Sequence, residues 1–280
     1  MTEVDYISGK VLVITGAGSG FGRQLMIECS ALGASVVGAD ISEEGLEETL
    51  RQTKKTGGAA VSCIADVTKL TDMQAVVAIA VAEFGRLDVL VNNAGIMPLA
   101  FYDDHAAAAV AWDRCIDINI KGVLHGIMAA YDQMIEQGRG HIVNLSSIYG
   151  NYPVVGAGVY GASKAAVDFL SASLRMEAQG KIKVTNVKPT GVPATNLGSG
   201  VVNNEAIVGI LGHKAPAYLQ MMQAHAADDL PAESTDVDNI EYYALDPQHL
   251  VEQIIHAVNQ PWGVTISDIT VRAAGDAYLL

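Results

Sequence analysis

The sequence predicts an α/β fold in which a doubly wound parallel sheet is covered by helices on both faces. Two observations support this prediction. Short runs rich in β-branched residues alternate along the chain with longer segments of helical spacing. The runs are apolar throughout, which is typical of parallel strands buried on both faces and joined by right-handed crossovers.

Seven runs are expected to form strands. They are residues 10–15, 34–40, 59–64, 87–91, 141–145, 183–187 and 264–271. No repeat or linker interrupts the 280 residues, so we expect a single domain over 1–280. One irregular region, 193–246, contains several glycines and an acidic patch. We interpret it as an enlarged substrate lid with at least one short helix; a solvated insertion is the alternative.

Composition excludes several classes of function. The chain has 31 acidic and 17 basic residues and a formal net charge of −14, which disfavours nucleic acid and anionic membrane surfaces as partners. The N-terminus is acidic, and no apolar stretch of about 18 residues occurs. Cys29, Cys63 and Cys115 are widely spaced, which predicts reduced thiols and neither a disulfide framework nor a metal site. We therefore expect a cytoplasmic protein with no metal.

A glycine-rich turn, from Gly16 to Gly22, follows the first run directly and opens a helical pattern. Glycines there allow a tight turn and close approach of backbone N–H groups to a pyrophosphate, and the helix N-terminus favours the anion. The strand–turn–helix context predicts a dinucleotide site. An ordinary glycine-rich turn is the alternative.

Asp40 ends the second run, eighteen residues after Gly22. A carboxylate there can accept hydrogen bonds from the adenosine ribose and would repel a 2′-phosphate, so we expect NAD and not NADP. Arg23 is expected to face solvent on the first helix. The alternative for Asp40 is a helix N-cap.

Two later runs also end in polar residues. Asp66 and Val67 are placed to meet the adenine, through the carboxylate and a backbone N–H. Asn92 and Asn93 lead into Ala94 and Gly95. Adjacent buried amides need partners, so we expect this pair to brace the sheet and to line the cofactor cleft.

Tyr160 and Lys164 lie four residues apart at the start of a helical segment, on one helix face. A phenol with a pKa near 10 is a poor base at neutral pH, and a neighbouring ammonium lowers that value. The pair suits proton exchange in a hydroxyl–carbonyl interconversion. Ser147, after the fifth run, could hydrogen-bond the substrate oxygen. Asn119 is predicted to lie inside a long helix, although Asn has a low helix propensity. A residue that departs from the local rule in this way can mark a functional site; the alternative is an exposed polar residue.

In order and spacing, these residues resemble the classical short-chain dehydrogenase/reductase family over Gly9–Val192 and again near the final strand, 266–272. The resemblance implies a Rossmann-like domain with a seven-stranded parallel sheet. It implies that Tyr160 is the catalytic acid/base, that Lys164 lowers its pKa and holds the nicotinamide ribose, that Ser147 polarises the substrate oxygen, and that Asn119 anchors a water in a proton relay. Family members are commonly homotetramers or homodimers that pair the helix near 110–135 and the helix starting at Tyr160.

Cofactor contacts are predicted along the whole carboxyl edge of the sheet. Besides Tyr160 and Lys164 they are Gly16, Ser19, Gly20, Phe21, Gly22, Asp40, Ile41, Asp66, Val67, Asn93, Ala94, Gly95, Pro189, Gly191, Val192 and Thr195. One departure from the family pattern is that Thr190 stands where a glycine is usual and Thr195 falls one residue late. The Thr195 contact is therefore the least secure of the set.

The leading interpretation is an NAD(H)-dependent oxidoreductase that interconverts a secondary alcohol and a ketone. The alternatives are an NADH-dependent ketone reductase in a biosynthetic route and a dinucleotide-binding regulatory protein. An uncharged hydrophobic, cyclic or aryl substrate is expected, because apolar and aromatic residues surround the predicted pocket. With Ser147 and Tyr160, the predicted pocket residues are Met97, Tyr149, Tyr152, Tyr218, Met221 and Met222. Ordinary packing is the alternative for the lid members.

Overall fold

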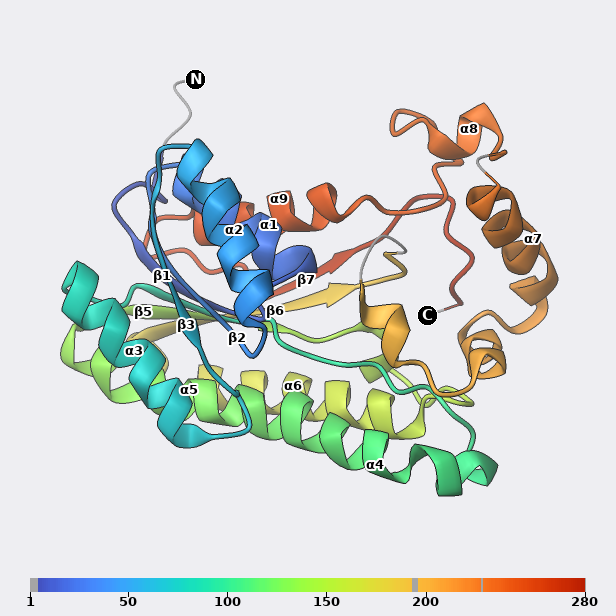
Figure 1. The fold of residues 1–280 in the computed structure, drawn as a ribbon, viewed down its shortest axis with the longest axis horizontal. Coiled ribbons are helices and arrows are strands. Elements are labelled where there is room, and N and C mark those ends of the chain that lie inside the picture. The colour runs from blue at the N-terminus through green and yellow to red at the C-terminus, as the bar shows by residue number, and fades with distance from the viewer. Residues whose placement is uncertain (1–4, 193–195, 228, 280) are drawn as a thin grey trace.

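The structure is a computed structural model that describes residues 5–192, 196–227 and 229–279. Its centre is a seven-stranded sheet in the order β3-β2-β1-β4-β5-β6-β7, with every neighbouring pair parallel (Figure 1). The strands are β1 (Val11–Thr15), β2 (Ser35–Asp40), β3 (Ala59–Ile64), β4 (Val89–Asn92), β5 (Gly140–Leu145), β6 (Ile182–Pro189) and β7 (Asp268–Val271). The doubly wound α/β prediction is confirmed, although the last strand is shorter than the predicted run.

Helices cover both faces of the sheet (Figure 1). On one face lie α1 (Gly20–Ala31), α2 (Glu43–Lys55) and α9 (Pro247–Val258). On the other lie α3 (Leu70–Phe84), α4 (His105–Cys115), α5 (Gly122–Glu136) and α6 (Gly158–Glu177). Alternate residues of β1 enter the two resulting cores: Val13 packs towards α3, α5 and α6, and Ile14 towards α1 and α9. Burial on both faces explains why the strand runs are apolar throughout.

The predicted long helix before β5 is interrupted in its middle. Between α4 and α5 the chain forms a π-helical turn, Ile116–Lys121, which contains Asn119. Turns of this kind insert a residue into the helix and occur often at functional sites. Asn119 is only 1% exposed, so the alternative of an exposed polar residue is wrong.

The segment between β6 and α9 is built from short helical pieces that lie beside the sheet (Figure 1). Its helices are α7 (Ala215–Ala226) and α8 (Ala232–Thr235), preceded by short 3₁₀ segments at Asn196–Gly200, Asn204–Ile210 and Gly212–Lys214. The expected short helix is therefore present. The C-terminal tail, residues 272–279, returns to this segment after β7, where the N–H of Leu279 donates to the carbonyl of Ile210.

Two further 3₁₀ segments, Tyr102–Asp104 and Ile148–Gly150, follow β4 and β5 along the chain. Within the described part of the chain, no helix has the length and apolar character needed to cross a membrane. The same residues contain no group of three or more His, Cys, Asp or Glu side chains placed to hold a metal ion.

Candidate active site

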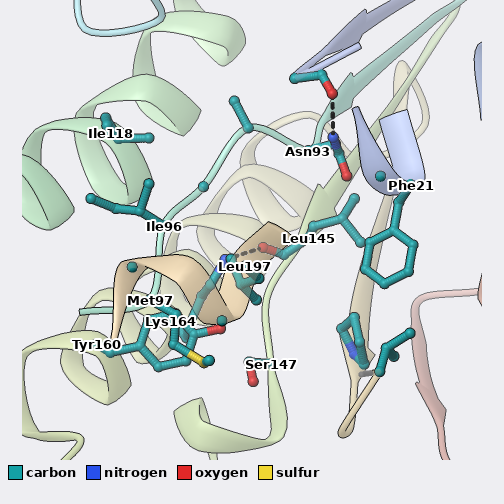
Figure 2. A pocket seen from close by; sticks show the side chains of 18 of the residues that line it. Phe21, Asn93, Ile96, Met97, Ile118, Leu145, Ser147, Tyr160, Lys164 and Leu197 are labelled. Carbon is teal, nitrogen blue, oxygen red and sulfur yellow. Dashed lines mark hydrogen bonds between the residues drawn. The ribbon is translucent and has the colours of Figure 1, made fainter. Parts of the chain in front are cut away.

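A cavity of about 710 Å³ opens at the carboxyl ends of the central strands. It lies where the strand order reverses between β1 and β4, which is where open α/β sheets bind ligands. Figure 2 shows Tyr160, Lys164 and Ser147 at one end of this cavity, and Phe21 and Asn93 at the other. The cavity therefore has one end formed by the residues predicted to be catalytic, called the catalytic end below, and another formed by the glycine turn.

The glycine turn is shaped by close backbone packing. A Cβ atom on Gly22 would lie 2.2 Å from the carbonyl oxygen of Gly16, so helix α1 can begin this close to β1 only with glycine. Gly20, by contrast, has a φ of +51° and nothing within 4 Å of the position of a Cβ atom. Because this space is empty, the backbone at Gly20 is accessible to a ligand. This cradle fits a pyrophosphate at the N-terminus of α1.

Asp40 lies across the turn from β1, with its carboxylate at the cavity wall. One oxygen accepts from the N–H of Gly18 at 2.9 Å, and the other from the N–H of Ser42 at 2.9 Å. Ser42, not Asp40, is the N-cap of α2, so the N-cap alternative for Asp40 is wrong. A ligand at this wall meets an anion that the backbone holds in a fixed orientation.

The expectation that Arg23 faces solvent is also wrong. Its guanidinium turns back under the glycine turn, donating to the carbonyl of Gly18 and, at 3.0 Å, to the hydroxyl of Thr49. The guanidinium turns towards the carbonyl groups of the turn because they accept charge-assisted hydrogen bonds from it, which the exposed surface of the helix does not offer. The hydrogen bonds of Arg23 thus stabilise the turn, and its side chain does not line the cavity.

Asp66 and Val67 form part of the same wall. The Asp66 carboxylate accepts from the hydroxyl and the N–H of Thr68, at 2.7 and 3.0 Å. The carbonyl of Val67 lies 2.9 Å from Nδ1 of His125 on α5. These contacts fix the position of the loop after β3, so that the planar ring of a ligand can lie against it.

The loop after β4 is held to the glycine turn by Asn93. Its side-chain amide donates to the carbonyl of Thr15 at 2.8 Å, and the Thr15 hydroxyl accepts from the backbone N–H groups of Asn93 and Ala94. The neighbouring Asn92 donates to Asn144 on β5 at 2.8 Å. As expected, one amide braces the sheet and the other lies in the cavity wall.

Asn119 holds the same loop from the other side. Its side-chain oxygen accepts from the N–H of Ile96 at 3.0 Å, and its amide donates to the carbonyl of Ile96 at 2.9 Å. The amide also donates to the hydroxyl of Ser163, which in turn donates to the carbonyl of Tyr160. The π-helical turn therefore connects the β4 loop to the helix that carries Tyr160.

The predicted catalytic side chains converge at one end of the cavity. Tyr160 is buried, and Ser147 lines the same end of the cavity. The Lys164 ammonium donates to the carbonyl of Leu145 at 2.8 Å and lies 5.8 Å from the centroid of the Tyr160 ring (Figure 2). A phenol, an ammonium and a hydroxyl that face one cavity can hold and move a proton at a bound oxygen.

Burial sets the protonation states at this end. It lowers the pKa of Lys164 to about 8, because a buried ammonium loses its hydration. It raises the pKa of Tyr160, and the nearby Ser147 hydroxyl partly opposes that rise. The pKa of Tyr160 in the protein alone is therefore above its ordinary value, where the sequence analysis expected it to be below. In this state the phenol is protonated.

Most predicted site residues share this cavity. From the cofactor set it is lined by Gly16, Ser19, Gly20, Phe21, Asp40, Ile41, Asp66, Val67, Asn93, Ala94, Gly95, Tyr160, Lys164, Pro189, Gly191 and Val192, and from the substrate set also by Ser147, Met97, Tyr149, Tyr218 and Met222. Gly22 and Asn119 lie behind its wall. Met221 is not in the lining, and neither is Tyr152, whose side chain is exposed. Thr195 lies outside the described residues.

The sequence analysis missed one major part of the wall. Tyr278, in the C-terminal tail, reaches the cavity, and its hydroxyl lies against Gly191, where a Cβ atom would be 1.8 Å away. No periodicity marks that tail; the only signal was an aromatic residue near the chain end. Thr190 also lines the cavity, and its buried hydroxyl has no hydrogen-bond partner within the described ranges.

Comparison with known proteins agrees with this geometry. Residues 10–206 match the model of the family described as short chain dehydrogenase. The chain belongs to this family. An uncharacterized oxidoreductase, SSP1627 of Staphylococcus saprophyticus, is 31% identical to it over 273 residues, which cover 97% of this chain and 98% of that protein. The short-chain dehydrogenase is thus an oxidoreductase.

Solved structures share the fold. A short-chain dehydrogenase/reductase of Burkholderia phymatum in complex with NAD is 28% identical, with a TM-score of 0.73 over 96% of this chain and 90% of that one. A metagenomic short-chain oxidoreductase in complex with NADP is 27% identical, with a TM-score of 0.70 over 95% and 97%. These relatives bind one or the other dinucleotide, so the choice between NAD and NADP has to be argued from the residues of this chain.

The burial of Lys164 predicts a pH-dependent contribution to stability. Its pKa is about 8 in the folded protein and near its ordinary value of 10.5 in the unfolded chain. Between these values the unfolded chain binds more protons, so the contribution of Lys164 to stability rises with pH; below pH 8 it is constant. We expect wild-type stability, relative to Lys164→Met, to increase by on the order of 1–3 kcal/mol from pH 8 to pH 10.

Urea unfolding at pH 7, 8, 9 and 10 measures this difference. Lys54→Met, which removes an exposed lysine of α2, corrects for the lost charge. If the difference in unfolding free energy between the wild type and Lys164→Met is the same at every pH, the Lys164 ammonium is not buried as described.

Proposed function

We propose that the chain is a cytoplasmic NAD(H)-dependent oxidoreductase that interconverts a secondary alcohol and a ketone. The observation that carries this proposal is the convergence of Tyr160, Ser147 and Lys164 on one end of a cavity whose other end is a glycine turn. One end suits proton exchange at an oxygen, and the other suits a dinucleotide.

A nicotinamide dinucleotide supplies the hydride chemistry when it is bound. In ketone reduction, the Tyr160 phenol, which is protonated because it is buried, gives its proton to the substrate oxygen. Ser147 orients that oxygen by a hydrogen bond. Lys164 provides a nearby positive charge that stabilises the phenolate left behind. In alcohol oxidation the same groups work in reverse, with Tyr160 accepting the proton.

We assign the preference for NAD(H) over NADP(H) to Asp40. Its carboxylate is fixed by two backbone N–H groups at the wall beside the glycine turn. Arg23, a cation of the turn, is engaged beneath it by Gly18 and Thr49. A 2′-phosphate at this wall would face an anion, whereas ribose hydroxyls can donate to it. This arrangement supports NAD(H).

Several apolar and aromatic residues of the cavity favour an uncharged hydrophobic substrate. Met97 and Tyr149 flank the catalytic end, with Met222 of α7 beyond them. The proposal that 193–246 acts as a substrate lid is supported by α7, whose Tyr218 and Met222 line the cavity. Such a lining suits a cyclic or aryl alcohol or ketone.

The first test is Tyr160→Phe. Without the hydroxyl the proposed acid/base is missing, so we expect turnover of secondary alcohols to fall roughly 10²- to 10⁴-fold. NADH binding, measured by fluorescence titration, should be retained. Tyr131→Phe, on α5 and outside the cavity, is the control. Substantial turnover in Tyr160→Phe, followed as NADH formation at 340 nm, would contradict the mechanism.

The second test is Asp40→Ala. Removal of the anion should raise kcat/KM with NADP relative to NAD by roughly tenfold or more, since a repulsion of over 1.4 kcal/mol is relieved. Asp103→Ala, away from the cavity, is the control. A wild-type enzyme that already prefers NADP would overturn the assignment.

We further propose that α4, α5 and α6 form a homo-oligomer interface, in a dimer or tetramer. Phe169 and Met176 of α6 are 78% and 74% exposed, and Val110 of α4 is 74% exposed. These helices lie side by side on one outer face (Figure 1). Large apolar side chains exposed together are typical of an interaction surface.

Phe169→Glu should therefore shift the mass measured by size-exclusion chromatography with light scattering towards the monomer. Ile240→Glu, which changes an equally exposed apolar residue before α9, should leave the mass unchanged. If both variants keep the wild-type mass, the interface lies elsewhere; if the wild type is a monomer, the assembly proposal is wrong.

A further inference from the structure

The wall of the cavity opposite the glycine turn carries an unusual concentration of tyrosine side chains. Tyr149, Tyr160, Tyr218 and Tyr278 all line the cavity, and they come from three separate parts of the chain. Tyr149 packs edge-on against Tyr160, with ring centroids 5.4 Å apart. The rings of Tyr218 and Tyr278 are 5.8 Å apart. Only Tyr160 is needed for the proposed chemistry.

Tyr218 and Tyr278 form a pair through their hydroxyl groups, whose oxygens are 3.1 Å apart. Two hydroxyls carry two protons, and the bond between them uses one. The second O–H remains able to donate, and both oxygens retain acceptor capacity. A polar group of this kind in a cavity wall is stabilised by a hydrogen-bonding partner.

The pair is held in place from both sides. The C-terminal tail is fixed to the segment between β6 and α9 by the N–H of Gly275, which donates to the carbonyl of Tyr242 at 2.9 Å. Within the tail, Arg272 pairs with Asp276. The Tyr278 hydroxyl lies directly against Gly191, so this tyrosine joins the tail to the loop after β6. Burial raises the pKa of Tyr278, which keeps its hydroxyl protonated.

We propose that the hydroxyl pair of Tyr218 and Tyr278 is a substrate-recognition site that binds a second oxygen-bearing group of the substrate. The favoured substrate is therefore a bifunctional molecule, such as a cyclic or aryl hydroxyketone, diketone or diol. One oxygen is positioned by Ser147 and Tyr160 for reaction, and the other hydrogen-bonds to the tyrosine pair. This inference rests on the proposed function and specifies its substrate class.

The test uses ketones matched in size but not in polarity. The pairs are 4-methylcyclohexanone with 4-hydroxycyclohexanone, and 4-phenylcyclohexanone with 4-(4-hydroxyphenyl)cyclohexanone. The wild type should have a higher kcat/KM for the hydroxyl-bearing member of at least one pair. Tyr278→Phe, which keeps the ring, should remove that preference, with a loss of about tenfold, as expected for one hydrogen bond, mainly through KM. Its rate with the methyl or phenyl ketone should stay within about twofold.

Tyr242→Phe is the matched control, because that hydroxyl accepts from the N–H of Asp246 outside the cavity. It should retain the preference, and Tyr218→Phe should lose it. Equal rates of the wild type with both members of each pair, or an equal loss for both in Tyr278→Phe, would overturn the recognition site while leaving the proposed function intact. A wild type that reduces no ketone of the panel would overturn the proposed function and this inference with it.

Discussion

The backbone from Asn93 to Ile96 is fixed from two directions, and the rest of the site depends on it. At one end, Asn93 ties the loop to the last residue of β1 and so to the glycine turn. At the other, both polar groups of the Asn119 side chain hold the backbone of Ile96. Because the segment is short and held at both ends, it sets the spacing between the dinucleotide end and the proton-exchange end. A shift at either anchor would misalign the two halves.

The same edge of the sheet carries several buried polar side chains that are hydrogen-bonded to one another. Asn92 donates to Asn144, and Asn144 donates to Ser171, so a chain of hydrogen bonds runs from β4 through β5 to α6. Removing one member would leave a buried partner unsatisfied, which costs more than the bond contributes. Lys164 is buried among these groups with one carbonyl as its acceptor. The network makes α6 a rigid support for Tyr160.

The sequence predicted what depends on local pattern and missed what depends on tertiary contact. Apolar runs and the glycine turn marked the strands and the dinucleotide end, because parallel strands and close backbone approach impose those residue types. Arg23 was placed wrongly because helix periodicity cannot reveal that unpaired carbonyls lie beneath the turn. The Tyr160 pKa was misjudged because burial depends on every element packed around the ring. Tyr278 was missed because its position results from the path of the tail after β7.

The proposed chemistry and the proposed substrate specificity rest on different parts of this chain. The family match ends at residue 206, and Asp40, Ser147, Tyr160 and Lys164 all lie within it. The far wall of the cavity comes instead from α7 and the C-terminal tail, through Tyr218, Met222 and Tyr278. Family membership therefore bears on hydride and proton transfer but says little about this wall. Segments fixed by a few hydrogen bonds, as the tail is to Ile210 and Tyr242, can change without disturbing the sheet. In this fold the choice of substrate can thus diverge while the catalytic end stays constant, and the tyrosine pair is the feature of this chain on which that choice most directly depends.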